Sequence, residues 1–226
     1  MLFYGSKRIS IFTGHYGSGK TEIALNYALH VNTPAIQTVL VDLDFINPYF
    51  RSREVRESLK LNGITVIASA EDYFDTDVPA LSPRIGGVLK DSAARVIADL
   101  GGNEAGARAV GRFRHQIAED EYELLFVVNP YRPSTANTDE INDVLTKIEG
   151  ASRLKVTALI SNPNLHCETT LENILFGHRT VLSASSSLGL PVRFIAVESG
   201  LARSPEICGL GLPVLEIKRQ MKAPWE

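Results

Sequence analysis

The feature that most constrains this chain is a glycine-rich octapeptide near its beginning, GHYGSGKT at residues 14–21. It fits the pattern G-x-x-x-x-G-K-[ST], and it stands between an apolar strand pattern at 9–12 and a helical pattern that begins at Lys20. Glycines permit backbone angles that other residues resist, so the N–H groups of such a loop can converge on a phosphate at the positive end of a helix dipole. Lys20 is placed to reach β- and γ-phosphate oxygens, and Thr21 can offer its hydroxyl to Mg²⁺. We therefore expect a nucleotide phosphate site; the alternative is a purely structural turn.

The composition permits one large α/β domain and argues against several other classes. The chain has 226 residues, of which 44% are hydrophobic, and a net charge of −3 gives no global argument for nucleic acid or an anionic membrane. No apolar run approaches the roughly 18–20 residues that span a bilayer, and the N-terminus leads almost directly into the first strand. Cys167 and Cys208 are too far apart for a C-x-x-C metal motif and fit a reducing compartment. We expect a cytoplasmic protein with a single domain over residues 1–226.

Apolar, β-branched runs alternate with helical patterns along the chain. The runs predict strands at 9–12, 38–41, 64–68, 95–99, 124–128, 155–160 and 191–197, with an edge strand at 211–217. The helical patterns begin at 20 and cover 47–61, 85–90, 105–118, 138–149 and 168–185, with Gly150 as an expected helix end and Gly177 as a weak point. Strands separated by single helices pair in parallel, and near-continuous apolar runs are covered on both faces. The prediction is a three-layer α/β/α fold with a mostly parallel sheet of about seven to eight strands.

Polar residues follow the predicted strands at the point where each strand ends. In sheets of this kind, ligands bind at the carboxyl ends of the strands, so we expect these residues to converge on one edge. They are the glycine-rich loop, Asp42 with Asp44, the run from Asp99 to Gly102, Asn129, Asn162 and Glu198 with Ser199.

Four of these stretches carry a resemblance to a known family: GHYGSGKT at 14–21, VDLDFINP at 41–48, VIADLGG at 96–102 and LISNPN at 159–164. In this order the chain resembles the MinD/ParA-like ATPases, within the larger class that includes nitrogenase iron protein, Mrp-type scaffolds and signal-recognition GTPases. The resemblance covers nearly the whole chain as an order of motifs. It implies a P-loop protein that binds Mg-ATP, hydrolyses it weakly and acts as a nucleotide-dependent switch.

The resemblance also implies roles for the acidic residues. Asp99 matches the acid that ends the family's Walker B strand and holds Mg²⁺, and Gly102 matches the glycine whose amide senses the γ-phosphate. Asp42 matches an acid near Mg²⁺, and Asp44 the acid that positions the attacking water. The expected metal residues are therefore Thr21, Asp42 and Asp99, and the expected catalytic residues are Lys20 and Asp44. Helix capping is the alternative for Asp99. For Asp42 and Asp44, the alternative is that one of the two caps the following helix or pairs with Arg51 or Arg53.

Asn162 matches the residue that many family members use to read the adenine edge. Its run, Asn162-Pro163-Asn164-Leu165, has neither the Lys nor the Asp of the guanine-reading N-K-x-D motif, which favours ATP over GTP; a simple turn is the alternative. The full expected nucleotide-binding set is Gly14, His15, Gly17, Ser18, Gly19, Lys20, Thr21, Glu22, Gly102 and Asn162.

The resemblance also implies binding partners, and the sequence leaves two alternative functions open. The family implies a protein partner that contacts the switch loops at 44–53 and 101–106, and a nucleotide-dependent homodimer. His15 stands where dimer-forming members carry a second lysine, so the dimer contact made by that lysine is in question. A small-molecule kinase or ATP-dependent ligase like the dethiobiotin-synthetase group, with an acceptor bound by 71–84, is one alternative. A non-hydrolysing nucleotide sensor is another.

Overall fold

A single parallel sheet forms the centre of the computed structural model, which describes residues 7–44, 53–68 and 82–220. All neighbouring strands pair in parallel, in the order β3-β2-β4-β1-β5-β6-β7-β8. The strands are β1 (Ile9–Thr13), β2 (Thr38–Leu43), β3 (Thr65–Ala68), β4 (Arg95–Leu100), β5 (Tyr122–Val128), β6 (Ala158–Ser161), β7 (Val192–Glu198) and β8 (Val214–Ile217). The predicted sheet is confirmed, including its edge strand.

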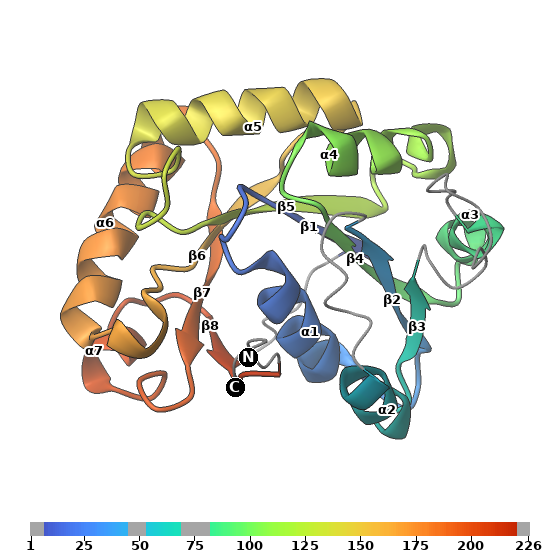
Figure 1. Cartoon of the computed structure of the whole chain (residues 1–226), viewed down its shortest axis with the longest axis horizontal. Helices are drawn as coiled ribbons and strands as arrows, with labels where there is room; N and C mark the ends of the chain where they lie inside the picture. The colour runs from blue at the N-terminus through green and yellow to red at the C-terminus, as the bar shows by residue number, and fades with distance from the viewer. Residues whose placement is uncertain (1–6, 45–52, 69–81, 221–226) are drawn as a thin grey trace.

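Helices cover the sheet on both faces, which confirms the three-layer prediction (Figure 1). Apolar residues of α1 and α2 pack on one face, and those of α3, α4, α5 and α6 pack on the other. The helices are α1 (Lys20–Val31), α2 (Arg53–Leu61), α3 (Pro83–Lys90), α4 (Glu104–Gly111), α5 (Thr138–Ser152), α6 (Leu171–Leu188) and the short α7 (Pro205–Cys208). Short 3-10 turns lie at Arg114–Gln116 and His166–Glu168.

The alternation of side chains along β1 explains why this strand is buried on both faces. Ile9 and Ile11 belong to the core cluster beneath α4 and α5, whereas Phe12 belongs to the cluster beneath α1. The ring of Phe12 meets that of Tyr27 edge to face, with 5.1 Å between their centroids. This packing fixes α1, and with it the loop that joins β1 to α1, against the centre of the sheet.

Three predicted helix ends are wrong, and that of α6 lies at Leu188 rather than at 185. Helix α5 continues through Gly150 and ends at Ser152, with Arg153 as its C-cap at a φ of 58°. The cost of one exposed glycine, about 1 kcal/mol, is too small to end a helix whose other side packs on the core. Helix α4 ends at Gly111 rather than 118, because the chain then turns so that Phe113 and Ile117 reach the core.

Gly177 proves to be a site of close packing rather than a weak point of α6. A methyl group built on it would lie 2.7 Å from Cβ of Pro163 and 2.9 Å from Cγ of Pro130. The helix therefore rests directly on the two Asn-Pro turns that follow β5 and β6. The predicted helix start at 47 and most of the predicted loop at 71–83 lie outside the described residues.

No helix in the described ranges is both long enough and apolar enough to cross a membrane.

Candidate nucleotide-binding site

The glycine-rich loop lies at the carboxyl edge of the sheet, between β1 and α1. Gly14 has a φ of 144°, and a methyl group built on it would lie 2.4 Å from the carbonyl oxygen of Val127. Gly19 has a φ of 90°, and a methyl group there would lie 2.5 Å from Nδ2 of Asn162. Both positions require glycine because of their backbone conformation and because neighbouring strands press against the loop.

The first turn of α1 places backbone N–H groups beside the glycine-rich loop, where they can bind a ligand. Gly19 is the N-cap in the left-handed conformation, and no side chain caps the helix. The N–H groups of a first helical turn have no partner within the helix, and they stand at the positive end of its dipole. Lys20 is the first residue of the helix and is only 6% exposed. An uncapped helix end beside a buried ammonium group is suited to an anion.

Lys20 and Gly102 come together although they lie in different loops. A methyl group on Gly102 would lie 3.0 Å from Nζ of Lys20 and 2.8 Å from the backbone nitrogen of Tyr16. The β4–α4 loop therefore borders the glycine-rich loop, as the sequence predicts. Any side chain at Gly102 would occupy the space beside the ammonium group.

Three acidic residues follow β2 and β4 beside this loop. Asp42 and Asp99 are register partners on neighbouring strands, and Oδ1 of Asp42 accepts a 2.9 Å hydrogen bond from the backbone N–H of Asp44. Thr21 donates a 2.6 Å hydrogen bond from Oγ1 to Oδ2 of Asp99. Oδ1 of Asp99 is buried and has no hydrogen-bond partner among the described residues. The expected metal residues are thus brought together.

Burial raises the pKa of both β-strand acids. The pKa of Asp42 rises to about 8, first because of burial and then because of the charge of Asp99. The pKa of Asp99 rises to about 7 through burial, against the opposing effects of Lys20 and the Thr21 hydrogen bond. A divalent cation would relieve the charge repulsion and supply a partner for the unpaired oxygen, so these residues fit Mg²⁺.

The described residues contain no cluster of three or more His, Cys, Asp or Glu side chains arranged to hold a metal by themselves. Mg²⁺ usually keeps several waters and takes only one or two carboxylates together with substrate phosphates. The hydroxyl of Thr21 and the carboxylates of Asp42 and Asp99 would likewise supply only part of the ligands that Mg²⁺ needs, and would leave the rest to water and phosphate.

Asp44 faces the β4–α4 loop. It is 9% exposed, and its Oδ1 lies 3.2 Å from the position that a methyl group on Gly101 would take. Asp44, the first residue of one loop predicted to respond to nucleotide, therefore lies against Gly101 of the other. The arginine side chains proposed as alternative partners, Arg51 and Arg53, lie outside the part of the chain whose side chains are described.

Asn162 contacts the glycine-rich loop itself. Its Nδ2 donates a 2.7 Å hydrogen bond to the carbonyl oxygen of Ser18, and the residue is 7% exposed. One N–H of the Asn162 amide thus anchors the loop. Recognition of adenine by the other N–H and by Oδ1 stays a prediction. Asn129 instead orders the neighbouring turns, since its Oδ1 accepts N–H groups from Tyr131 and Asn164.

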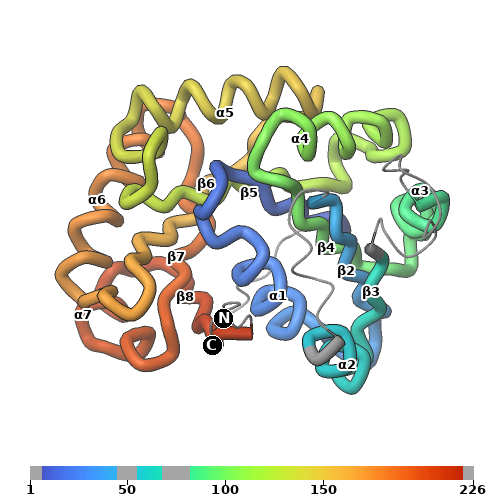
Figure 2. The backbone as a smooth tube through the Cα atoms, in the orientation of Figure 1, coloured from blue at the N-terminus to red at the C-terminus, as the bar shows by residue number. Residues whose placement is uncertain are grey.

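The side chains of Glu22 and His15 make contacts of other kinds. Oε1 of Glu22 accepts a 2.6 Å hydrogen bond from the backbone N–H of Gln220, and Asn26 exchanges two hydrogen bonds with the backbone of Lys218. The segment after β8 is therefore tied to α1 (Figure 2). Glu22 can contribute its first-turn N–H to a phosphate, but its side chain serves this tie. His15 is partly exposed, with Nδ1 3.1 Å from the carbonyl oxygen of Tyr16.

Sequence reasoning missed Arg132, which lies in the loop after β5. Its Nε donates a 3.1 Å hydrogen bond to the carbonyl oxygen of Gly17. The contact depends on β5 lying next to β1, which the order of elements in the chain does not reveal. The only local signal is the rigid run Asn129-Pro130-Tyr131-Arg132-Pro133 directly after a buried strand.

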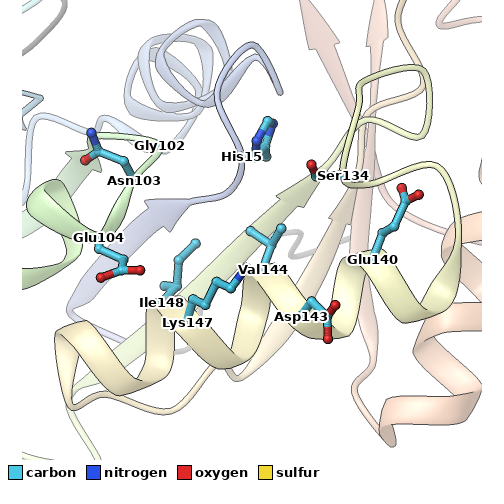
Figure 3. A pocket seen from close by; sticks show the side chains of 10 residues that line it. All are labelled: His15, Gly102, Asn103, Glu104, Ser134, Glu140, Asp143, Val144, Lys147 and Ile148. Atoms are coloured by element: carbon cyan, nitrogen blue, oxygen red, sulfur yellow. The ribbon is translucent and has the colours of Figure 1, made fainter.

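A cavity of about 340 Å³ opens beside His15, between the glycine-rich loop, α4 and α5 (Figure 3). It is lined by His15, Gly102, Asn103, Glu104, Ser134, Glu140, Asp143, Val144, Lys147 and Ile148. Charged side chains from α5 line one wall, and His15 and Ser134 face each other across the rim (Figure 3).

No family model matches the chain, and no curated protein matches it in sequence. Solved structures match it in fold. The signal recognition particle receptor FtsY from Elizabethkingia anophelis, in complex with GDP, gives a TM-score of 0.54 at 17% identity over 86% of this chain and 58% of that one. FtsY from Thermotoga maritima gives 0.55 at 19% identity, over 87% and 64%. FlhF complexed with GMPPNP/Mg²⁺ gives 0.51 at 14% identity, over 85% and 66%.

The chain spans less than two thirds of the length of each of these proteins. At such low sequence identities, the structural similarity shows a shared fold and does not show a shared function. The signal-recognition GTPases belong to the larger class that the motif order indicated. The comparisons do not assign the chain to the MinD/ParA-like group within that class. The chain has the α/β fold of the P-loop nucleoside triphosphatases.

Proposed function

We propose that this protein binds Mg-ATP at the β1–α1 loop, hydrolyses it slowly and signals the state of the nucleotide through its switch loops, in the manner of the MinD/ParA-like ATPases. The observation that carries the proposal is the uncapped N-terminus of α1 with Lys20 buried beside it. Together they form a site for the phosphates of a nucleotide, and the neighbouring residues Thr21 and Asp99 fit the accompanying metal.

Each residue has a definite task in this proposal. The loop N–H groups and Lys20 bind and neutralise the phosphates, and the hydroxyl of Thr21 with the carboxylates of Asp42 and Asp99 would hold Mg²⁺. When bound, that ion supplies charge neutralisation on the phosphate oxygens. Asp44 orients the water that attacks the terminal phosphorus atom. Phosphoryl transfer needs this kind of positioning and charge neutralisation more than covalent help from the protein.

The choice of ATP rests on the run after β6. FtsY and FlhF carry GDP and GMPPNP in the structures compared above, but this chain has no N-K-x-D run after Ser161. The amide of Asn162 can donate to and accept from an adenine edge with its remaining groups. We therefore propose ATP as the preferred nucleotide.

The switch proposal rests on the contact between Asp44 and Gly101. A γ-phosphate next to Lys20 and Gly102 would act on both switch loops at once, because the loops already touch each other. We propose that a protein partner recognises them in the nucleotide-bound state. Formation of a homodimer across the nucleotide is a second way to signal the nucleotide state, in which His15 takes the place of the family's lysine.

Calorimetric titration with Mg-ATP and Mg-GTP tests this function. Wild type should bind ATP more tightly than GTP, and Lys20→Ala should abolish binding. Lys90→Ala, which removes an exposed lysine from α3, serves as the matched control and should bind as wild type does. Tighter binding of GTP would overturn the choice of nucleotide, and binding retained in Lys20→Ala would overturn the site.

One observation favours a second candidate function. The cavity beside His15 and Gly102 adjoins the expected position of the terminal phosphate, so it could hold a small acceptor for phosphoryl transfer. Incubation with γ-labelled ATP separates the two functions. Release of label as inorganic phosphate alone supports hydrolysis, and label in an organic product supports a kinase.

A further inference from the structure

Arg132 lies against the glycine-rich loop with most of its guanidinium still available. Its Nε donates to the carbonyl oxygen of Gly17 at 3.1 Å, and Nε, Cδ and Cζ all lie within 3.6–4.0 Å of the position of a methyl group on Gly17. The four N–H groups on its two Nη atoms have no hydrogen-bond partner among the described residues, and the side chain is exposed. One bond thus aims the group, and its other donors are unused.

The loop that carries Arg132 is held firmly. The backbone N–H of Arg132 donates to the carbonyl oxygen of Asn129, and its carbonyl oxygen accepts from the N–H of Thr135. Thr135 is fully buried, and its hydroxyl donates to the carbonyl oxygen of Asn129 at 2.8 Å. The hydroxyl of Tyr131 donates to the carbonyl oxygen of Asn173 on α6. Much of the entropy of placing this arginine is therefore already lost before a ligand arrives.

The charge of the site calls for a second cation. Asp42, Asp44 and Asp99 lie on the β2–β4 side of the loop, and Lys20 is buried in its centre. A nucleoside triphosphate adds several more negative charges beside these three acids, and the ammonium group together with the proposed Mg²⁺ ion would not balance all of them. Besides Lys20, Arg132 is the cation that the described hydrogen bonds place on this loop. A guanidinium is suited to phosphate because it offers paired N–H groups in a fixed plane.

The geometry indicates which phosphate Arg132 would meet. Lys20 reaches β- and γ-phosphate oxygens in loops of this type, and its Nζ lies beside Gly102. Gly102 borders the backbone of Tyr16, and Gly17 is the next residue along the loop. Arg132 thus reaches the same end of the phosphate chain from the β5 side, on the opposite flank from the β4–α4 loop. Ser134 of its own loop lines the cavity together with Gly102 (Figure 3).

We propose that Arg132 binds the terminal phosphate of the bound nucleoside triphosphate through its Nη groups while Nε holds Gly17. The proposal rests on the proposed nucleotide site and adds a specific reader of the triphosphate within the same chain. Arg132 thereby lets the loop distinguish a triphosphate from a diphosphate. A purely structural clamp on Gly17 would instead support both nucleotides equally.

Paired titrations separate these roles. Wild type, Arg132→Gln and Arg132→Lys are titrated with Mg-AMPPNP and with Mg-ADP, and Arg179→Gln, an exposed arginine on α6, is the matched control. Loss of a charge-assisted pair should weaken AMPPNP binding by about 10- to 100-fold in Arg132→Gln, with ADP binding changed by less than about threefold. Arg132→Lys should recover part of the loss, and Arg179→Gln should match wild type.

Each other outcome overturns the proposal in a distinguishable way. An equal loss of AMPPNP and ADP binding in Arg132→Gln, at an unchanged melting temperature, would leave Arg132 as a clamp on the loop. Unchanged binding of both would remove it from the site. A parallel titration tests guanine nucleotides on the wild type. If wild type binds neither adenine nor guanine nucleotides, the proposed function and this inference are overturned together.

Discussion

The hydroxyl of Thr21 donates a 2.6 Å hydrogen bond to one carboxylate oxygen of Asp99, while the other oxygen is buried with no partner among the described residues. The pair joins the first turn of α1 to the end of β4. A buried carboxylate oxygen without a partner is costly, so the pair is poised to accept a cation or a water held by one. One hydrogen bond therefore joins the helix that we propose binds phosphate to the strand whose acid fits the metal.

Thr21→Ala should weaken nucleotide binding mainly when magnesium is present. The change removes a hydroxyl that fits Mg²⁺ and also leaves a second oxygen of Asp99 unpaired. We expect the dissociation constant for Mg-ATP to rise by about tenfold or more, corresponding to loss of about 1.5–3 kcal/mol. Thr21→Ser, which keeps the hydroxyl, should remain near wild type. The measurement is calorimetry with Mg²⁺ and with EDTA, and an equal loss under both conditions would contradict the metal role.

The stability of the nucleotide-free protein should depend on pH through Asp42. Its pKa rises from 3.8 to about 8 in the folded protein. A group with a raised folded pKa contributes stability that is fully present below the unfolded value and is lost as pH rises through the folded one. We therefore expect wild type to lose stability relative to Asp42→Asn between pH 6.5 and 8.5.

Melting temperatures of the two proteins at both pH values measure this effect. Burial lowers the pKa of His178, which gives that residue the opposite dependence at acid pH. His178 is present in both proteins, so its effect cancels in the difference between them. A difference that stays constant from pH 6.5 to 8.5 would show that Asp42 does not titrate in this range.

Asp44→Ala should lower turnover and largely spare binding. Its carboxylate lies beside Gly101 rather than on the glycine-rich loop that we propose contacts the phosphates, so it can orient water without being needed to hold nucleotide. We expect the rate of ATP hydrolysis to fall by about 10²-fold or more, with the dissociation constant changed by less than about threefold. Single-turnover hydrolysis and calorimetry provide the two numbers. Hydrolysis at the wild-type rate would refute the role assigned to Asp44.

The strands were predictable because their signal is local. Apolar, β-branched runs such as the one in β5 are buried on both faces of a parallel sheet, and no distant contact is needed to recognise them. The gathering of Asp42, Asp99 and Asn162 near one loop was predictable for a related reason: parallel strands all end at the same edge. The end of α5 was not, because packing of its far side outweighs the local effect of Gly150.

The second layer of the site could not be read from the sequence. Arg132 reaches Gly17 only because β5 lies next to β1, and Asn162 anchors Ser18 only because β6 follows β5 in the sheet. Which strands are neighbours depends on the topology of the sheet, whereas the octapeptide at 14–21 can be recognised from its sequence alone. The side-chain contact of Glu22 with the backbone N–H of Gln220 could not be read from the sequence either, while binding of phosphate by the backbone N–H of Glu22 stays a prediction.

Two glycine-to-alanine changes in helices should have opposite effects on stability. In Gly177→Ala the new methyl group would meet Pro163 at 2.7 Å and Pro130 at 2.9 Å, and rigid proline rings cannot easily give way. We expect a loss of about 1–3 kcal/mol in the free energy of unfolding. Gly150→Ala meets nothing within 4 Å and should gain about 0.5–1 kcal/mol. Urea unfolding of both variants tests this, and shifts of the same sign would contradict the packing of α6.

Asn162→Ala should affect every nucleotide to some extent and ATP most of all. The variant loses the hydrogen bond to the carbonyl oxygen of Ser18, so the phosphate loop is held less firmly whichever base is bound. That common loss should be about fivefold to tenfold, the value of one hydrogen bond, and a contact with adenine should add a similar loss for ATP alone. Titrations with Mg-ATP and Mg-GTP measure both parts, with Asn142→Ala on the exposed face of α5 as control. Equal losses would restrict Asn162 to anchoring the loop, and no loss would contradict both roles.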